Sequence, residues 1–271
     1  MSIVHKIYYK KAFSFQKLNE KLNISDLVVD NKTENLNYYY IWGKSARGLD
    51  ISIEKGFIEI RNTTLSNKAD YVLTNQIVFE ILNFVSGNLY NEDGDLLTDQ
   101  TIYNDFQINE LLINDSSVVN ILSKENNSIE IFCPIKNVHF GRRTFERFAH
   151  LNGVDLKNEV FKLIHKVQYE LPNYPAGNIM RVGSDENAKI IKLITREVDY
   201  IIEKYDNIIL YREGDEMLMI DNETLISIIP KSWQLIDAII IVAPILNEDE
   251  WQKLIEDATP FNMYNTFAHG S

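Results

Sequence analysis

The sequence predicts an α+β fold in which mostly antiparallel sheets of hairpins are packed by amphipathic helices. Several segments alternate apolar and polar residues on both sides of a short turn that contains glycine, which is typical of β-hairpins. Other segments repeat apolar residues every three or four positions, which indicates helices with one buried face. Apolar residues make up 45% of the 271 residues, enough for a full core without a disulfide or a structural metal.

The first elements are expected to be a strand, a helix and a hairpin. Ile3–Tyr9 predicts a strand, and a short helix should follow it with Ser14 as its N-cap. Leu36–Gly43 is rich in aromatic residues and predicts another strand. The alternating segments on either side of Lys55-Gly56 predict a hairpin.

The strongest helix signal lies just before Gly87, where apolar residues form one broad face. They are Tyr71, Val72, Ile77, Val78, Ile81, Leu82 and Val85. We expect Gly87 to end this helix in the left-handed conformation. Two short strands should then flank a turn at Asp93-Gly94, and a second, short helix should cover residues 115–126.

The middle of the chain predicts strands over residues 127–135 and 137–140, followed by helices over 142–153 and 155–171. Residues 171–178 hold two of the six prolines and mark the predicted break between two regions. The predicted domains are therefore an N-terminal α+β region, residues 1–171, and an acidic C-terminal α+β region, residues 172–271. One continuous domain is equally compatible with the sequence.

The last third of the chain contains one ambiguous stretch. Residues 178–194 fit a hairpin around Gly183–Asn187, but Lys189–Tyr205 also keeps a helical spacing, and the periodicity does not decide between strand and helix. A hairpin with its turn at Gly214-Asp215 should follow. Ala238–Leu246 predicts a buried strand, and a final helix should begin with acidic residues, as the helix dipole favours.

The charge of the chain is strongly negative, with 27 basic and 39 acidic residues and a net charge of −12. This balance argues against a nucleic-acid-binding face, because affinity for nucleic acid depends largely on lysine and arginine. Residues 213–271 hold two lysines against eleven acidic residues, which leaves a net charge of −9. Such a region either keeps the protein soluble or attracts a basic protein partner, and we take Glu248, Asp249 and Glu250 as candidate binding residues.

The protein is expected to be cytoplasmic and not to associate with membranes. Cys133 is the only cysteine, so no intrachain disulfide can form, which fits a reducing compartment. Its apolar surroundings predict a small buried side chain rather than a nucleophile. The N-terminus has no signal peptide, and Ala238–Leu246 is too short for a membrane helix.

Two segments concentrate residue types that bind ligands or partners. His139, Arg142, Arg143 and Glu146 lie around the start of a predicted helix, where they form either a solvated charged face or an anion site. Trp42 and Arg47 lie beside a glycine-flanked turn, together with Tyr38–Tyr40 and Lys44. They form either a recognition patch or ordinary strand packing.

Motifs of catalytic and metal sites are missing from the sequence. It contains no HExxH, CxxC, GxSxG, GxGxxG or P-loop pattern, so we expect neither a metal site nor a cofactor. This absence favours a non-enzyme. The alternative is a hydrolase or phosphate-binding enzyme that uses the segment from His139 to Glu146.

Three segments carry a resemblance to a known group of proteins: "SARGLDISIEKGFIEIRNTTLSNKADY", "NEDGD" and "IDAIIIVAPILNEDEWQKLIEDA". They resemble uncharacterised bacterial cytosolic proteins, some of which are similar to immunity proteins of contact-delivered toxin systems. The resemblance implies a non-enzymatic protein. The net charge of −9 over residues 213–271 and the absence of catalytic motifs favour an immunity protein that blocks a basic toxin through the acidic C-terminal region. A homo-oligomer in which residues 260–271 dock on a neighbouring copy is a further alternative.

Overall fold

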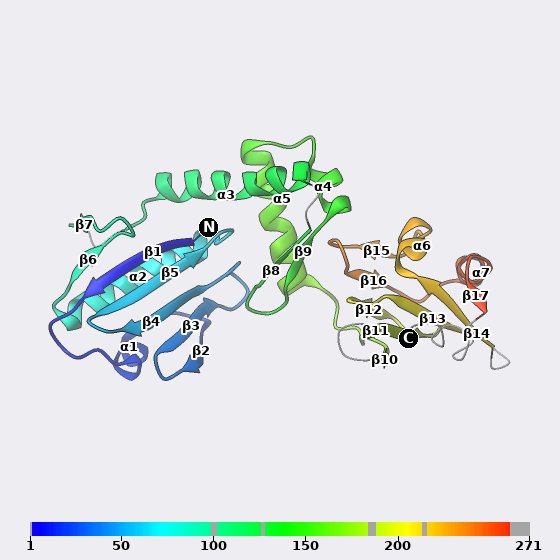
Figure 1. The fold of residues 1–271 in the computed structure, drawn as a ribbon, viewed down its shortest axis with the longest axis horizontal. Helices are drawn as coiled ribbons and strands as arrows, with labels where there is room; N and C mark the ends of the chain where they lie inside the picture. The colour runs from blue at the N-terminus through cyan, green and yellow to red at the C-terminus, as the bar shows by residue number, and fades with distance from the viewer. Residues whose placement is uncertain (1, 99–101, 126–127, 184–187, 213–215, 261–271) are drawn as a thin grey trace. The chain divides into compact units, whose positions relative to one another are not determined.

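The computed structural model describes residues 2–98, 102–125, 128–183, 188–212 and 216–260 (Figure 1). The chain divides into two compact units, Met1–Glu170 and Leu171–Ser271. This division lies next to the boundary that the proline-containing segment predicts after residue 171. Both units mix helices with sheets whose described strand pairs are antiparallel, apart from one parallel pair, so the predicted α+β class is confirmed.

The first unit is built on one antiparallel sheet with the strand order β2-β3-β4-β5-β1-β6-β7. The strands are β1 (Ser2–Tyr8), β2 (Leu27–Thr33), β3 (Leu36–Ile41), β4 (Leu49–Glu54), β5 (Phe57–Thr63), β6 (Asn88–Tyr90) and β7 (Leu96–Leu97). The predicted hairpin joins β4 to β5, and its turn uses the left-handed conformation of Gly56 at φ +93°. The edge strand β2 was not predicted, because only its first three residues are apolar.

One face of this sheet is covered by two helices, α1 (Phe15–Lys21) and α2 (Lys68–Val85) (Figure 1). Leu18 of α1 is fully buried against the sheet, as are five apolar residues of α2: Leu73, Ile77, Val78, Ile81 and Val85. Val72 of the predicted apolar face is 37% exposed instead. Ser14 caps α1 as predicted, since its Oγ accepts the Lys17 N–H at 3.3 Å. The predicted role of Gly87 is wrong, because Ser86 takes the left-handed conformation instead, with φ 52°. Gly87 is needed for close packing: a Cβ there would lie 2.5 Å from the Tyr8 carbonyl oxygen.

The rest of the first unit contains α3 (Asp105–Glu125), the hairpin of β8 (Ile129–Ile131) and β9 (Val138–Phe140), α4 (Arg142–Phe148), α5 (Gly153–His165) and the π-helical turn η1 (Lys166–Glu170). Helix α3 begins ten residues before the predicted start. Its beginning is marked by reciprocal hydrogen bonds between Asn104 and Gln107, a capping signal that the sequence contains. Among the described residues, no helix has both the length and the apolar composition that crossing a bilayer requires.

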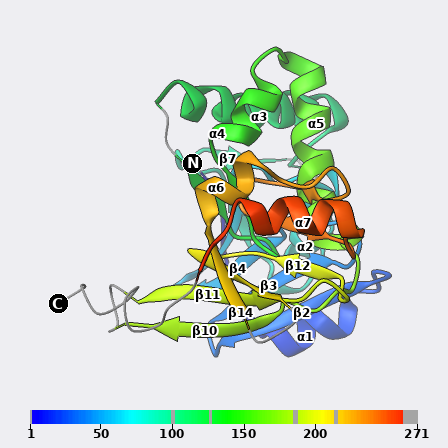
Figure 2. The ribbon, with the colours of Figure 1, turned by 90° about the vertical axis from the view of Figure 1, so that its right-hand side faces the viewer.

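The second unit contains two small sheets. The first has the order β10 (Asn178–Val182), β11 (Lys189–Ile194), β13 (Asn207–Arg212), β14 (Glu216–Asp221) and β17 (Thr259–Pro260). The second has the order β12 (Tyr200–Ile202), β16 (Ile241–Ala243) and β15 (Gln234–Leu235). Helices α6 (Asn222–Ser227) and α7 (Glu248–Glu256) lie on one side of the first sheet (Figures 1 and 2), where Trp251 and Leu254 belong to the same core as Leu210 of β13.

The structure also resolves the ambiguous predictions in this unit. Lys189–Tyr205 forms strands and no helix, because β11 pairs with β10 on one side and β13 on the other. The predicted strand Ala238–Leu246 is reduced to three residues of β16. Its start is folded into a turn, since Asp237 Oδ1 accepts the N–H groups of Ile239 and Ile240 at 2.9 and 2.8 Å. The turn expected at Gly214-Asp215 lies outside the described residues, although β13 and β14 do pair antiparallel.

A buried histidine in β1 should make the stability of the protein depend on pH. His5 is only 3% exposed, and burial lowers its pKa from 6.5 to about 4. The unfolded chain therefore binds a proton between these two values that the folded chain does not bind. The free energy of unfolding should fall by about 3 kcal/mol as the pH is lowered from 6.5 to 4.

The variant His5→Phe isolates this contribution, because phenylalanine keeps the edge-to-face contact with Tyr103 and cannot be protonated. Urea unfolding at a series of pH values should show a shallower dependence for the variant than for the wild type. Parallel curves for the two proteins across this range would show that His5 does not contribute.

Candidate binding site

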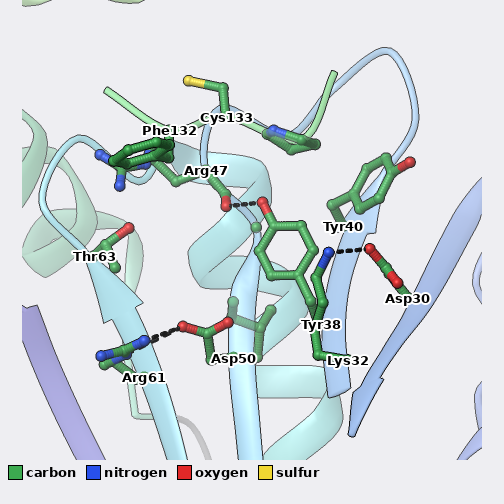
Figure 3. Close-up of a pocket in the computed structure, with 13 residues that line it drawn as sticks. Asp30, Lys32, Tyr38, Tyr40, Arg47, Asp50, Arg61, Thr63, Phe132 and Cys133 are labelled. Carbon is green, nitrogen blue, oxygen red and sulfur yellow. Dashed lines mark hydrogen bonds and ion pairs between the residues drawn. The ribbon is translucent and has the colours of Figure 1, made fainter. Parts of the chain in front are cut away.

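A cavity of about 400 Å³ opens on the face of the first sheet opposite to α2 (Figure 3). Residues alternate between the two faces of a strand, so Tyr38, Asp50 and Arg61 point away from the core (Figure 3). Tyr38 and Arg61 both lie opposite Asp50 in the strand register, which places the three side chains in one row across the sheet. The loop after β8 contributes Phe132 to the cavity wall.

The loop between β3 and β4 brings Arg47 to this cavity, and Asp70 of α2 holds the loop in place. The Asp70 carboxylate accepts the N–H groups of Ala46, Arg47 and Gly48 at 3.2, 2.9 and 2.9 Å. It also accepts the N–H of its own N-cap residue, Asn67, at 2.9 Å. Burial raises the pKa of Asp70, and these hydrogen bonds oppose that shift by stabilising the carboxylate.

The carbonyl groups of the same loop are bound by the end of α5 and by η1. Tyr169 donates its hydroxyl to the Ser45 carbonyl at 2.8 Å, and Gln168 Nε2 donates to the Ala46 carbonyl at 2.9 Å. His165 Nε2 lies 3.3 Å from the Gly43 carbonyl oxygen. The loop is therefore hydrogen-bonded on both its donor and its acceptor side, and π-helical turns like η1 are frequent at functional sites.

Arg47 is held by hydrogen bonds of its guanidinium group and of its backbone carbonyl, but one nitrogen of the guanidinium has no acceptor among the described residues. Its Nη1 donates to the Thr64 carbonyl at 2.9 Å, and its own carbonyl accepts the hydroxyl of Tyr38. Its Nε is buried and has no hydrogen-bond partner among the described residues. A buried donor without an acceptor costs about 1–3 kcal/mol.

The other charged groups of the cavity form pairs. Lys32 pairs with Asp30, and Arg61 donates to Asp50 Oδ2 through Nε at 3.1 Å and Nη2 at 2.5 Å (Figure 3). Burial raises the pKa of the Cys133 thiol to about 12, so it is not a thiolate at neutral pH. The described residues contain no cluster of histidine, cysteine and carboxylate side chains that could hold a metal ion. These groups can bind and orient a ligand.

The structure places the two residues of the predicted aromatic patch differently. Arg47 lines the cavity, whereas Trp42 is 54% exposed and packs edge-on against Tyr169, with the ring centroids 6.0 Å apart. Sequence reasoning marked the aromatic stretch that contains Tyr38 but missed Asp50 and Arg61 as cavity residues. Their signal was present, because they occupy polar positions of the alternating pattern that predicted β4 and β5.

The residues around the start of α4 include members of two local ion pairs. Arg142 is 83% exposed and pairs with Glu146, with 2.9 Å between Nε and Oε1. His139 lies on β9 opposite Glu130, with 3.6 Å between the ring Nε2 and the carboxylate. Arg143 is exposed on the first turn of α4.

The three acidic residues at the start of α7 have separate roles. Glu248 forms an ion pair with Arg196. Asn247 caps the helix by accepting the Glu250 N–H at 2.9 Å. The Glu250 carboxylate accepts the side-chain amide of Asn247 at 2.9 Å and the N–H of Ser232 at 3.2 Å. Asp249 is exposed and lines a second cavity, which lies within the second unit.

Comparison with known proteins gives one match. A family model described as "Domain of unknown function (DUF4299)" matches residues 2–204, which include the whole of the first unit and the first strands of the second. This match confirms the expected membership in an uncharacterised family. No curated protein and no solved structure matches the chain, so the resemblance to immunity proteins stays a prediction.

The variant Asp70→Asn should destabilise the protein strongly. An amide offers one oxygen where the carboxylate offers two, and its NH₂ group would face backbone donors. Even with the amide oxygen in the place of Oδ2, the Gly48 N–H and the new NH₂ group are left as unsatisfied buried donors. The free energy of unfolding should therefore fall by about 3 kcal/mol or more.

Urea unfolding at neutral pH measures this change, with Asp105→Asn as the matched control. Asp105 is 83% exposed, and its ion pair with Lys68 should contribute less than about 1 kcal/mol. If the two variants lost the same stability, Asp70 would not be holding the loop.

Proposed function

The chain belongs to the DUF4299 family, and we propose that it is a non-enzymatic binding protein whose first unit holds a small ligand in the cavity at Arg47. The observation that carries this proposal is a cavity of about 400 Å³ whose wall includes Arg47, on a loop that is held by hydrogen bonds to both its N–H and its carbonyl groups. Rigid support of a cavity wall is the arrangement expected of a preorganised binding site.

The chemistry of the cavity supports binding rather than catalysis. The carboxylates of Asp30 and Asp50 are engaged by cations, and the thiol of Cys133 is protonated at neutral pH. The alternative of a hydrolase or phosphate-binding enzyme depends on the segment from His139 to Glu146. This alternative receives less support, because Arg142 already pairs with Glu146 and the side chains of both residues are exposed.

The proposal predicts that ligands of the cavity stabilise the protein through Arg47. A thermal-shift screen of metabolite-sized anionic, neutral and cationic compounds should find stabilisers of the wild-type chain. The variant Arg47→Met, which keeps the length of the side chain without its charge, should lose their effect.

The control for this screen is Arg142→Met, an exposed arginine changed in the same way on α4. Stabilisers should act on this control as they act on the wild type. Hits that act equally on Arg47→Met would place the ligand site elsewhere and contradict the proposal.

A second candidate function is the capture of a basic protein by the acidic second unit, as an immunity protein captures a toxin. The net charge of −9 over residues 213–271 supports this candidate, since complementary charge speeds association. The exposure of Asp249 and Glu256 on α7 is consistent with it. Glu248 and Glu250 are less suitable for substitution, because Glu248 forms an ion pair with Arg196 and Glu250 accepts the N–H of Ser232.

The double variant Asp249→Asn with Glu256→Gln therefore tests the second candidate. Its affinity for a basic protein recovered from the native lysate should fall about tenfold at low salt, and less at moderate salt. The control is Glu92→Gln with Asp93→Asn, which removes the same charge from an exposed turn of the first unit. An equal loss in both double variants would reflect net charge and not an α7 surface.

A further inference from the structure

We propose that β10, at the edge of a sheet in the second unit, is an interaction surface that pairs with β10 of a second copy of this chain as an antiparallel strand. The surface shares no residue with the cavity at Arg47 and does not depend on the function proposed for that cavity. Three features support it: the contrast between β10 and the other sheet edges, the side chains of β10, and the distribution of charge in the second unit.

The edges of the two larger sheets differ in how well they resist pairing with another strand. An exposed edge strand offers unpaired backbone N–H and C=O groups, and proteins protect such edges with bulges, charged residues or very short strands. Edge strand β2 has a register shift between Asn31 and Thr33 and carries two charged residues, Asp30 and Lys32. Edge strands β7 and β17 are only two residues long. These three edges are therefore protected.

Edge strand β10 is regular and only weakly protected. It runs over five residues, pairs with β11 in an unbroken register and carries one charged residue, Arg181. Among the described residues, no strand pairs with its other side (Figure 2). Ile179 on this strand is 59% exposed, which is unusual for a β-branched apolar side chain in a sheet. A regular edge with an exposed apolar residue is suited to accept a further strand.

The sequence of β10 is compatible with pairing to itself. One antiparallel register, centred on Met180, pairs all five residues with those of an identical strand. In this register Ile179 lies opposite Arg181 of the second copy, and Asn178 lies opposite Val182. The aliphatic part of an arginine can cover an apolar side chain, and no like charges lie directly opposite each other. Such a pair is closed by a twofold axis, so β10 is no longer open to a third copy.

The distribution of charge favours pairing of two copies at β10. Each copy carries a net charge of −12, so two copies repel each other overall. Residues 213–271 carry −9 of this charge, whereas residues 171–212, which contain β10, hold six basic and six acidic residues. The strand therefore belongs to a part of the chain without net charge, where repulsion between copies is weaker.

Analytical ultracentrifugation of the full chain over a range of concentrations tests this proposal. The wild type should pass from monomer to dimer as the concentration rises. Ile179→Lys places a positive charge opposite Arg181 of the second copy, so the Kd of the dimer should rise about tenfold or more. Ile179→Glu places a negative charge there and should dimerise more tightly than the lysine variant. Net charge alone predicts the reverse order, because lysine lowers and glutamate raises the negative charge of each copy.

The control is Ile245→Lys, the same change at an isoleucine that is 52% exposed and lies outside the strands. Its dimer should keep the Kd of the wild type. A wild-type chain that stays monomeric at every concentration would overturn the proposal. A dimer that Ile179→Lys leaves intact would overturn it as well, since the interface would lie elsewhere. Equal weakening by lysine and glutamate at this position would contradict the antiparallel register.

Should Ile179→Lys fail to fold, hydrogen exchange of the wild type at low and high concentration still decides. Amides of β10 should gain protection as the concentration rises, whereas those of the protected edge strand β2 should not. Exchange of the β10 amides that does not change with concentration would overturn the proposal.

Discussion

The hydrogen bonds from the loop at residues 46–48 to the buried carboxylate of Asp70 are the constraint on which the candidate site depends. Asp70 lies at the start of α2, and its carboxylate joins this helix to the turn between β3 and β4. A buried carboxylate is unfavourable without partners, so the loop and the helix start stabilise each other. Because the loop is fixed by its backbone, the conformation of Arg47 does not have to be selected by the ligand.

The opposite side of the loop extends this constraint to the end of the first unit. Gln168 and Tyr169 lie in η1, the last element of this unit, and both donate to loop carbonyls. Asp70 and η1 therefore hold the donors and the acceptors of one short segment from two different helices. A shift of the loop backbone at Arg47 would therefore alter hydrogen bonds both at the start of α2 and at η1, because both elements bind backbone groups of this loop.

Much of this fold was predictable, because local patterns agree with the tertiary structure there. The β4–β5 hairpin alternates cleanly, and α2 carries a broad apolar face. The failures have physical causes. Strand β2 lies at the edge of the sheet, so little of it is buried. Asp237 folds the residues before β16 into a turn through hydrogen bonds that the hydrophobic periodicity of the sequence does not indicate. The candidate site was predicted at Arg47 and at the aromatic stretch that contains Tyr38 and Tyr40. Its other residues come from strands that the sequence separates, and the role of Asp70 depends on contacts 22 to 24 residues away in the chain.

Amide hydrogen exchange of the free, full-length chain, followed by NMR, tests the central claim most directly. If Asp70 holds the loop, the N–H groups of Ala46, Arg47 and Gly48 should exchange as slowly as those of the central strands β4 and β5. This protection should exist before any ligand is added. Rapid exchange of these three amides, at the rate of exposed turns such as the one at Gly94, would show that the loop is not preorganised and would contradict the account.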